Sequence, residues 1–381
     1  MVAFAFAPPP VSPEAERLRA EIREFLATEL RGRSAAARAG SWGSRDPEFS
    51  RKMGARGFIG MTWPKRYGGH ERTALERYVV LEEVLAAGAP MGAHWIADRQ
   101  SGPLLLRFGT EEQRQRILPR IAAGECYFCI GMSEPDSGSD LAATRTRAVP
   151  VQGGFLVNGT KIWTSNAHQC HYVILFCRTE VATSADRHAG VSQFLVDLSL
   201  PGITIRPIRD LTGEHHFNEV VFADVFLPAD ALIGELGAGW RQVTSELAYE
   251  RSGPERFLST YVLLVELVRA LGSQPSERAA IAAGRLTGHI IILRRLSRSV
   301  AGMLQAGEDP ALQAALVKDL GTTLEQEIPE VARLLIEPGS RPRDAYDAVL
   351  AHAIMRAPSF SIRGGTREIL RGIVARGLGV R

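Results

Sequence analysis

The spacing of apolar residues predicts helices from about residue 12 to residue 122. Ser12 has the side chain of a helix N-cap, and Pro13 follows it at a position that tolerates proline. Apolar residues then recur three and four positions apart, the period of one helix face, at Leu18, Ile22, Phe25, Leu26 and Leu30. Further amphipathic helices are predicted over 79–85 and 111–121.

The period changes to two between about residues 123 and 233, which predicts β-strands. Gly, Pro, Asn and Asp separate short runs of β-branched and aromatic residues, a pattern typical of an antiparallel barrel or sandwich. These runs are Tyr127 to Ile130, Phe155 to Val157, Tyr172 to Phe176, Phe194 to Val196, Ile203 to Ile208 and Val220 to Phe226.

The helical period returns after Gly237-Ala238-Gly239 and continues to the end of the chain. The order of helices, strands and helices predicts an α+β protein in which a β domain lies between two helical regions. We therefore predict an N-terminal helical domain over 1–122, a β domain over 123–233 and a C-terminal helical domain over 234–381.

Composition narrows the class of protein. Of 381 residues, 45% are apolar and 23% are charged, as in ordinary globular proteins, and a net charge of +3 gives no argument for a nucleic-acid partner. No apolar run is long enough to suggest membrane insertion. Cys126 and Cys129 have C-x-x-C spacing, but they lie in a predicted strand that would point them to opposite faces. We expect no metal site, reduced thiols and a cytoplasmic location.

Two polar, Gly-containing segments are the strongest candidates for chemistry. Ser133–Asp140 offers hydroxyls and a flexible glycine, and a nest of backbone N–H groups there would suit a phosphate or a flavin carbonyl. Asn158–Asn166 is predicted to be a second loop and carries Trp163, which would stack on a cofactor ring. By composition alone, the first segment is equally compatible with an ordinary hairpin turn, and Trp163 is equally compatible with a place in the protein core.

Four segments in this order resemble the acyl-CoA dehydrogenase family, and with a segment from Leu104 to Gln113 the resemblance covers nearly the whole chain. They are Ser133-Glu134-Pro135-x-Ser-Gly-Ser139-Asp140, Asn158-Gly159-x-Lys161-x-Trp163-x-Ser165-Asn166, Phe217-Asn218-Glu219-Val220 and Gly364-Gly365-Thr366-x-Glu368-Ile369.

The resemblance implies a helical N-terminal domain, a middle antiparallel β-barrel, a C-terminal four-helix bundle and the cofactor FAD. The family desaturates acyl-CoA thioesters in β-oxidation and branched-acyl catabolism, and passes the electrons to an electron-transfer flavoprotein. Its members usually form homotetramers. The cofactor-binding residues that the resemblance implies are Met132, Ser133, Ser139, Trp163, Ser165, Thr366 and Glu368. Ser139 and Arg251 are the implied substrate contacts.

The resemblance also implies where the catalytic base lies. One branch of the family has a Glu directly before the Gly-Thr of the last motif, but that position is Gly364 here. Another branch has the base in a Glu-Arg pair on a long helix, which matches Glu250-Arg251. Helical geometry puts Glu250 on the same apolar face as Val243 and Leu247, where desolvation would raise its pKa. We predict Glu250 as the base and the Gly364 N–H as a donor to the thioester carbonyl.

Two departures from the family pattern leave alternatives open. The segment Val268–Gly272 lacks the phenylalanine of the family motif that reaches a neighbouring subunit's FAD, and Arg363 replaces a usually aromatic or small residue. A sister subunit would complete such a site, so a dimer or a hetero-oligomer is possible, and so is a non-catalytic partner subunit. An acyl-CoA oxidase, an enoyl-CoA reductase and a flavin monooxygenase remain alternatives on the same fold.

Overall fold

The computed structural model describes residues 5–180, 186–336 and 344–380, except the side chains of 246–250. The chain divides into two compact units. Unit one comprises Met1–Arg45, Arg72–Gly92 and Ala248–Arg381, and unit two comprises Asp46–Glu71 and Ala93–Leu247. The helical zone at the start of the chain therefore contributes segments to both units.

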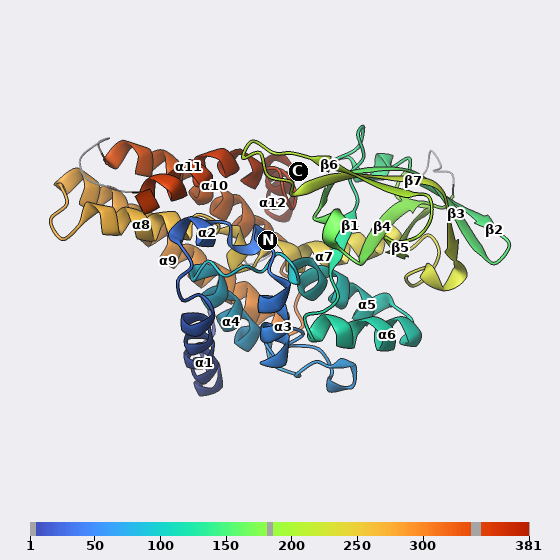
Figure 1. The fold of residues 1–381 in the computed structure, drawn as a ribbon, viewed down its shortest axis with the longest axis horizontal. Helices are drawn as coiled ribbons and strands as arrows, with labels where there is room; N and C mark the ends of the chain where they lie inside the picture. Colours follow the sequence, from blue (N-terminus) through green and yellow to red (C-terminus); the bar gives the residue numbers. More distant parts are fainter. Residues whose placement is uncertain (1–4, 181–185, 337–343, 381) are drawn as a thin grey trace. The chain divides into compact units, whose positions relative to one another are not determined.

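Unit two contains a seven-stranded sheet, whose strands are labelled in Figure 1. The strands are β1 (Phe128–Gly131), β2 (Arg147–Val151), β3 (Gly154–Ser165), β4 (Tyr172–Arg178), β5 (Val191–Asp197), β6 (Ile203–Ile208) and β7 (Phe217–Pro228). Their order is β1-β4-β2-β3-β7-β6, and β5 pairs with β4. Four of the strand pairs are antiparallel, as predicted, whereas β1 runs parallel to β4.

The main core of this unit lies against the sheet, and strands β4 and β5 are buried on both faces, since consecutive residues along them are buried. Val157, Val173, Leu175, Phe194 and Val220 belong to one buried cluster. Within this cluster, Val173 and Leu175 alternate along β4 as the period of two predicts, since successive side chains of a strand point to opposite faces.

Residues 158–165 are part of strand β3, so the prediction of a loop over 158–166 was wrong for all but its last residue. The strand accommodates its polar and glycine residues through two shifts of register against β7, between Val157 and Gly159 and between Lys161 and Thr164. Such bulges absorb extra residues without ending the ladder. Residues 158–165 form a strand because β7, some 60 residues further along the chain, supplies their hydrogen-bonding partners. The local sequence does not indicate this pairing.

Four helices belong wholly or partly to unit two. They are α3 (Pro47–Ala55), α5 (Gly102–Phe108), α6 (Glu111–Ala122) and the first part of α7 (Gly239–Arg251). Helix α6 begins where predicted, because the Thr110 side chain accepts the Gln113 backbone N–H and the Gln113 side chain accepts the Thr110 backbone N–H. This reciprocal capping satisfies two donors that the first turn would otherwise leave unpaired.

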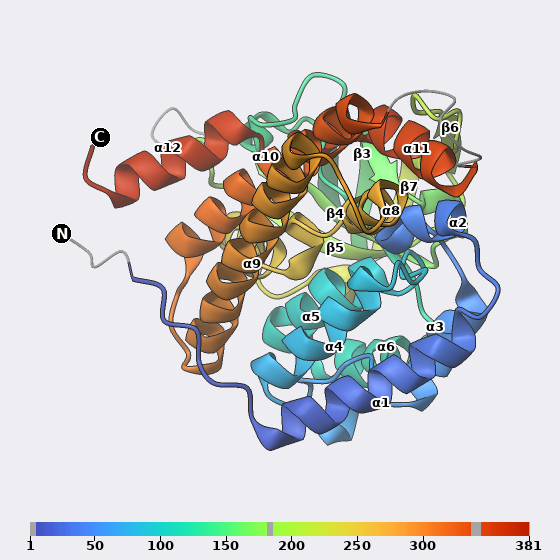
Figure 2. The ribbon, with the colours of Figure 1, turned by 90° about the vertical axis from the view of Figure 1, so that its left-hand side faces the viewer.

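Unit one is helical, and Figure 2 shows its helices. They are α1 (Pro13–Glu29), α2 (Ala35–Ala39), α4 (Ala74–Ala86), α8 (Tyr261–Leu271), α9 (Glu277–Gln305), α10 (Ala311–Leu335), α11 (Asp344–Phe360) and α12 (Arg367–Gly377). Helix α10 contacts α8, α9, α11 and α12, which confirms a C-terminal helical bundle, and α4 packs on both α1 and α9. Ser12 caps α1 by accepting the Ala15 N–H.

Within the described residues, no helix of 18 or more residues is apolar enough to span a membrane. The four cysteines are free, as predicted. Burial raises the pKa of the Cys126 thiol to about 11 and that of the Cys177 thiol to about 12, so both stay protonated near neutral pH.

Candidate functional site

The two polar segments singled out in the sequence are in direct contact in unit two. The Ile162 N–H donates to the Ser133 carbonyl at 2.9 Å, and the Lys161 ammonium donates to the Met132 carbonyl at 3.0 Å. Strand β3 therefore runs beside the segment that leaves β1. Met132, Ser133 and Trp163, all predicted cofactor contacts, come together in this way.

A buried ion pair between Lys161 and Glu134 holds this junction. Their side chains are 2.8 Å apart and almost completely shielded from solvent. The carboxylate also accepts from the Thr144 hydroxyl at 2.5 Å and from the backbone N–H groups of Arg145 at 2.7 Å and Thr146 at 2.9 Å. A buried carboxylate with this many donors is fully hydrogen-bonded, which is the condition for its burial.

Burial and pairing act on the pKa of Glu134 in opposite directions. Burial alone would raise the pKa of the carboxyl, but the Lys161 ammonium and the hydrogen bonds lower it to about 2. For Lys161 the directions are reversed: burial lowers the pKa of the ammonium, and the negative charge of Glu134 opposes that change. Glu134 is thus a fixed negative charge that orients Lys161. Both residues belong to the family-like motifs, and their pairing is apparent only in the structure.

Trp163 is the most exposed large aromatic feature of strand β3. It is 55% exposed, its φ of 59° lies in the left-handed region, and it sits in the second register shift of the strand. Its ring meets Phe217 edge to face at 5.8 Å. The alternative of a core tryptophan is therefore wrong. The bulge therefore leaves a flat apolar surface open to solvent.

The loop Ser133–Asp140 serves partly as an ordinary turn. Glu134 and Ser137 exchange two backbone hydrogen bonds, at 2.7 and 3.1 Å, and the Ser137 hydroxyl donates to the Asp140 carbonyl at 2.7 Å. Ser139 is exposed at the tip, and Ser133 and Ser165 are half-buried. Ser133, Ser139 and Ser165 therefore remain accessible to a ligand, whereas the hydroxyl of Ser137 is used within the loop.

The last motif forms a glycine turn in unit one. Gly364 and Gly365 have φ values of 63° and 93°, a region that side chains disfavour. Buried cations hold both carbonyls: Arg251 Nε donates to Gly364 O at 3.3 Å, and Lys318 Nζ donates to Gly365 O at 3.4 Å. The turn is thus fixed by residues from α7 and α10.

Helix α12 starts directly after this turn. The Thr366 hydroxyl accepts the Ile369 N–H at 3.5 Å and caps the helix, and Glu368 lies exposed in its first turn. Hydrogen bonds from its own backbone N–H and from the Thr366 hydroxyl lower the pKa of Glu368. The N-terminus of an eleven-residue helix favours a phosphate through its dipole and free N–H groups.

Glu250 and Arg251, the predicted base and its neighbour, lie at the end of helix α7. Glu250 belongs to helix α7, but its side chain lies outside the described residues. Arg251 is buried and bonds the Gly364 carbonyl, which gives it a contact within the protein. The predicted roles of Glu250 as base and of Arg251 as a substrate contact stay predictions.

Arg363 occupies a position where related sequences usually have an aromatic or small residue. Its guanidinium pairs with the fully buried Glu325 at 3.0 Å and lies 4.5 Å from the ring centres of Trp42 and Phe360. It also donates to the Ser259 hydroxyl at 2.8 Å. Phe360 is close to Arg363 in the chain, but Trp42, Ser259 and Glu325 come from three distant stretches of unit one, so no local signal in the sequence indicates the cluster.

One group of possible metal ligands occurs among the described residues. Side-chain ligand atoms of Asp210, Glu214 and His216 lie within 4.8 Å of one another in the loop between β6 and β7. His216 is 2.5 Å from Glu214, and Asp210 accepts hydrogen bonds from Thr212. These are the contacts of a tight turn, and they account for the proximity of the three residues.

Comparisons with known proteins identify the chain over most of its length. The family model described as acyl-CoA dehydrogenase, N-terminal domain, matches residues 12–125, and that of the middle domain matches residues 129–225. Acyl-CoA dehydrogenase IpdE1 of Mycobacterium tuberculosis is 33% identical over 383 residues, 95% of this chain and 96% of that protein. Acyl-CoA dehydrogenase FadE34 of the same organism is 32% identical over 325 residues, and the chain spans only 44% of its length.

Solved structures agree with this result. The structure titled Tcur3481-Tcur3483 steroid ACAD has a TM-score of 0.85 and 28% identity, and covers 97% of this chain and 98% of its own. The ChsE4-ChsE5 complex from Mycobacterium tuberculosis has a TM-score of 0.82 and 29% identity over 98% of this chain and 99% of its own.

Proposed function

Because this chain belongs to the acyl-CoA dehydrogenase family of oxidoreductases, we propose that it catalyses the FAD-dependent α,β-dehydrogenation of an acyl-CoA thioester. The observation that carries the proposal is Trp163. Its exposed ring sits at a strand bulge beside Ser133, held there by the buried pair of Lys161 and Glu134. This ring offers a flat apolar surface on which the isoalloxazine would stack.

Each unit, taken by itself, has residues with the chemistry that FAD binding would use. In unit two, Trp163 would stack on the isoalloxazine, and Met132, Ser133 and Ser165 would line its polar edge. In unit one, Thr366 and Glu368 would lie along the ADP part, at the N-terminus of α12. FAD, when bound, supplies the acceptor for the hydride that leaves the β-carbon.

Two groups of this chain would act on the thioester itself. Glu250 removes the α-proton as general base, and the Gly364 N–H donates to the thioester carbonyl, where negative charge develops. Arg251, next to Glu250 in the chain, bonds the Gly364 carbonyl. That bond joins the end of α7, which carries the base, to the turn that carries the donor. Ser139 would contact the CoA moiety.

The substrate class and the partners follow from relatives as proposals. Two similar structures have titles that name a steroid ACAD and a complex of two different chains. We propose a bulky or branched acyl group, for which the missing side chain at Gly364 leaves room, in catabolism by β-oxidation. Electrons would pass to an electron-transfer flavoprotein in the cytoplasm, where the free thiols fit a reducing environment.

Assembly is part of the proposal. Helix α9 has an exposed apolar face at Ile281, Ile291 and Ile292, and added Cβ atoms at Gly284 and Gly288 would meet nothing within 4 Å. A face of this kind on a soluble helix is a surface for another subunit. A homotetramer or dimer uses it with identical chains. The second candidate is a hetero-oligomer, which the lost phenylalanine in Val268–Gly272 favours.

The test combines an acyl-CoA panel with one variant. Straight, branched and steroid-derived acyl-CoAs are mixed anaerobically with the flavin-loaded protein, and bleaching of the flavin band identifies the best substrate. Glu250→Gln should then lower kcat at least about 100-fold, since it loses the general base while retaining FAD. Glu235→Gln, an exposed carboxylate ahead of α7, is the matched control and should keep normal turnover.

Other outcomes separate the alternatives. Near-normal turnover of Glu250→Gln removes this residue from the mechanism. Rapid peroxide formation when the reduced protein meets air indicates an oxidase. A colourless protein that takes up no FAD indicates a non-catalytic partner subunit and contradicts the enzyme proposal.

A further inference from the structure

Two aromatic rings and two hydrogen bonds from Nη2 hold the Arg363 guanidinium, whereas its buried Nε has no hydrogen-bond partner among the described residues. Its guanidinium lies 4.5 Å from the ring centroid of Trp42 and 4.5 Å from that of Phe360. It donates to Glu325 at 3.0 Å and to the Ser259 hydroxyl at 2.8 Å. Stacking and directed hydrogen bonds together leave such a group almost no freedom, since a planar guanidinium satisfies both at once.

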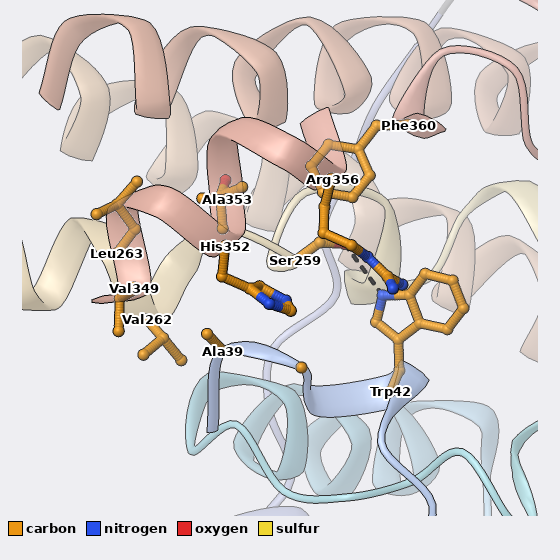
Figure 3. A pocket seen from close by; sticks show the side chains of 12 residues that line it. Ala39, Trp42, Ser259, Val262, Leu263, Val349, His352, Ala353, Arg356 and Phe360 are labelled. Carbon is orange, nitrogen blue, oxygen red and sulfur yellow. Dashed lines mark hydrogen bonds between the residues drawn. The ribbon is translucent and has the colours of Figure 1, made fainter. Parts of the chain in front are cut away.

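The partners of Arg363 are themselves held in place. The Ser259 N–H donates to the second oxygen of Glu325 at 2.9 Å, and the Trp42 indole N–H donates to the Ser259 hydroxyl at 3.2 Å. Trp42, Ser259 and Phe360 also line a small pocket among α2, α8 and α11 (Figure 3). Burial lowers the pKa of Arg363 only to about 10, so the cation persists near neutral pH.

Arg363 directly precedes the glycine turn. Gly364 and Gly365 carry no side chain and have positive φ, so their own conformational preferences do not define the turn. The contacts of Arg251 and Lys318 reach the carbonyls of Gly364 and Gly365, which lie after the Gly364 N–H. That N–H belongs to the peptide unit that joins Arg363 to Gly364. Its direction therefore depends on how firmly the Arg363 backbone is held.

We propose that Arg363 is a positioning residue for the reaction: its clamped side chain fixes the peptide unit of Arg363 and Gly364, so that the Gly364 N–H points at the thioester carbonyl. The inference rests on the proposed function. It assigns a purpose to a cation that the sequence presents only as a departure from the family. An oxyanion donor loses most of its effect when it moves by about 1 Å, because the benefit depends on preorganisation.

The principal variant is Arg363→Lys, tested in the flavin-loaded enzyme with the acyl-CoA that bleaches wild type fastest. Lysine keeps the charge but loses the planar fork and the stacking. We expect kcat to fall about 10- to 100-fold while KM changes less than about threefold. We also expect the carbonyl stretch of the bound thioester, measured by Raman difference spectroscopy, to return toward its frequency in solution.

Two further variants keep the test decisive. Arg363→Met combined with Glu325→Gln removes both charges, so it leaves no unpaired buried carboxylate and should fold even where the single variant does not. It should show the same loss of kcat. Arg367→Lys is the matched control. Arg367 lies beyond the turn and pairs with Asp319 at 3.0 Å, and Asp319 belongs to helix α10, as Glu325 does. The control should keep kcat within about twofold.

Several results would overturn the inference. They are a kcat within about twofold of wild type in the folded double variant, a loss of kcat with an unchanged carbonyl frequency, and an equal loss in Arg367→Lys. If no acyl-CoA bleaches the wild-type flavin, the proposed function fails first. A wild type that bleaches, together with an unaffected Arg363→Lys variant, rejects only the positioning role.

Discussion

Buried charges connect separate stretches of this chain at single residues. Two of the four lysines in the sequence, Lys161 and Lys318, have no exposed surface, and each bonds to backbone carbonyls of a candidate site segment. Desolvating a cation is costly, so each is held where several acceptors converge. Lys161 meets Met132 and Glu134, and Lys318 meets Gly365. These cations fix the backbone from which the predicted ligand contacts project.

The Glu134 and Lys161 pair gives a prediction about acid stability. Glu134→Gln should lower the free energy of unfolding at pH 7 by about 3–5 kcal/mol, because it leaves the Lys161 ammonium buried without its counter-charge. The folded-state pKa of Glu134, about 2, lies below the ordinary value of ~4.3, so its stabilisation is complete above that ordinary value. The stabilisation disappears as the pH falls toward the folded-state value.

Urea unfolding at a series of pH values, monitored by circular dichroism, measures this difference between wild type and variant. We expect the gap to be largest at neutral pH and to close between about pH 4 and pH 2. The double variant Glu134→Gln with Lys161→Met is the control, and it should be less destabilised than the sum of the single changes. A gap under about 1 kcal/mol at pH 7, or one independent of pH, contradicts the role assigned to the pair.

At the scale of elements, two irregular segments determine what the candidate site presents. Strand β3 contains a register shift that exposes Trp163, and the glycine turn before α12 carries the predicted carbonyl donor. Both contain residues with positive φ, which regular strands and helices do not accept. In each case hydrogen bonds from a neighbouring element hold the irregular backbone, from β7 in the strand and from α7 and α10 at the turn.

Gly365→Ala tests the glycine turn. The residue has φ of 93°, and an added Cβ would come 3.2 Å from Arg251 Nη2, so alanine adds both backbone strain and crowding. We expect a lower melting temperature together with a kcat reduced by about tenfold or more, because Arg251 must shift away from the turn.

Gly379→Ala is the matched control for this variant. Gly379 follows α12 with φ of 75°, and an added Cβ there would meet nothing within 4 Å. Its substitution should cost about 1 kcal/mol of stability from strain alone and leave kcat unchanged. If Gly365→Ala and Gly379→Ala change kcat equally, crowding of Arg251 does not affect turnover.

At the scale of the whole molecule, two compact units each carry a distinct part of the proposed chemistry. Unit two holds Trp163 and the segment around Ser133, and unit one holds Arg251 and the glycine turn. The exposed face of α9 in unit one is the surface that we propose for subunit contact. It includes Ile281, Ile292 and the bare backbone at Gly288.

Ile292→Glu should therefore reduce the mass of the assembly. A charge on this face would have to be desolvated in a subunit interface, which costs several kcal/mol. Light scattering coupled to size exclusion should give the wild type as a multiple of the 41.5 kDa chain and the variant closer to one chain. Thr287→Glu, exposed on the flank of the same helix, should keep the wild-type mass. An unchanged mass for Ile292→Glu contradicts the assignment of this face.

The order of elements was predictable because its causes are local. Residues within four positions of one another form the caps at Ser12 and Thr110, and the change from a helical period to a period of two depends only on neighbouring side chains. The ordered motifs likewise identified the family.

Long-range packing decided the rest. Asn158–Asn166 has the composition of a loop, yet it pairs as a strand because β7 supplies the partner ladder. Arg363 is a second example: its contacts with Trp42, Ser259 and Glu325 come from distant parts of the chain, so the local sequence does not explain it. The sequence by itself determined the order of the helical and strand zones and the family to which they belong. The tertiary structure decided which polar residues are buried as fixed charges and which face solvent, because that depends on neighbours tens to hundreds of residues away.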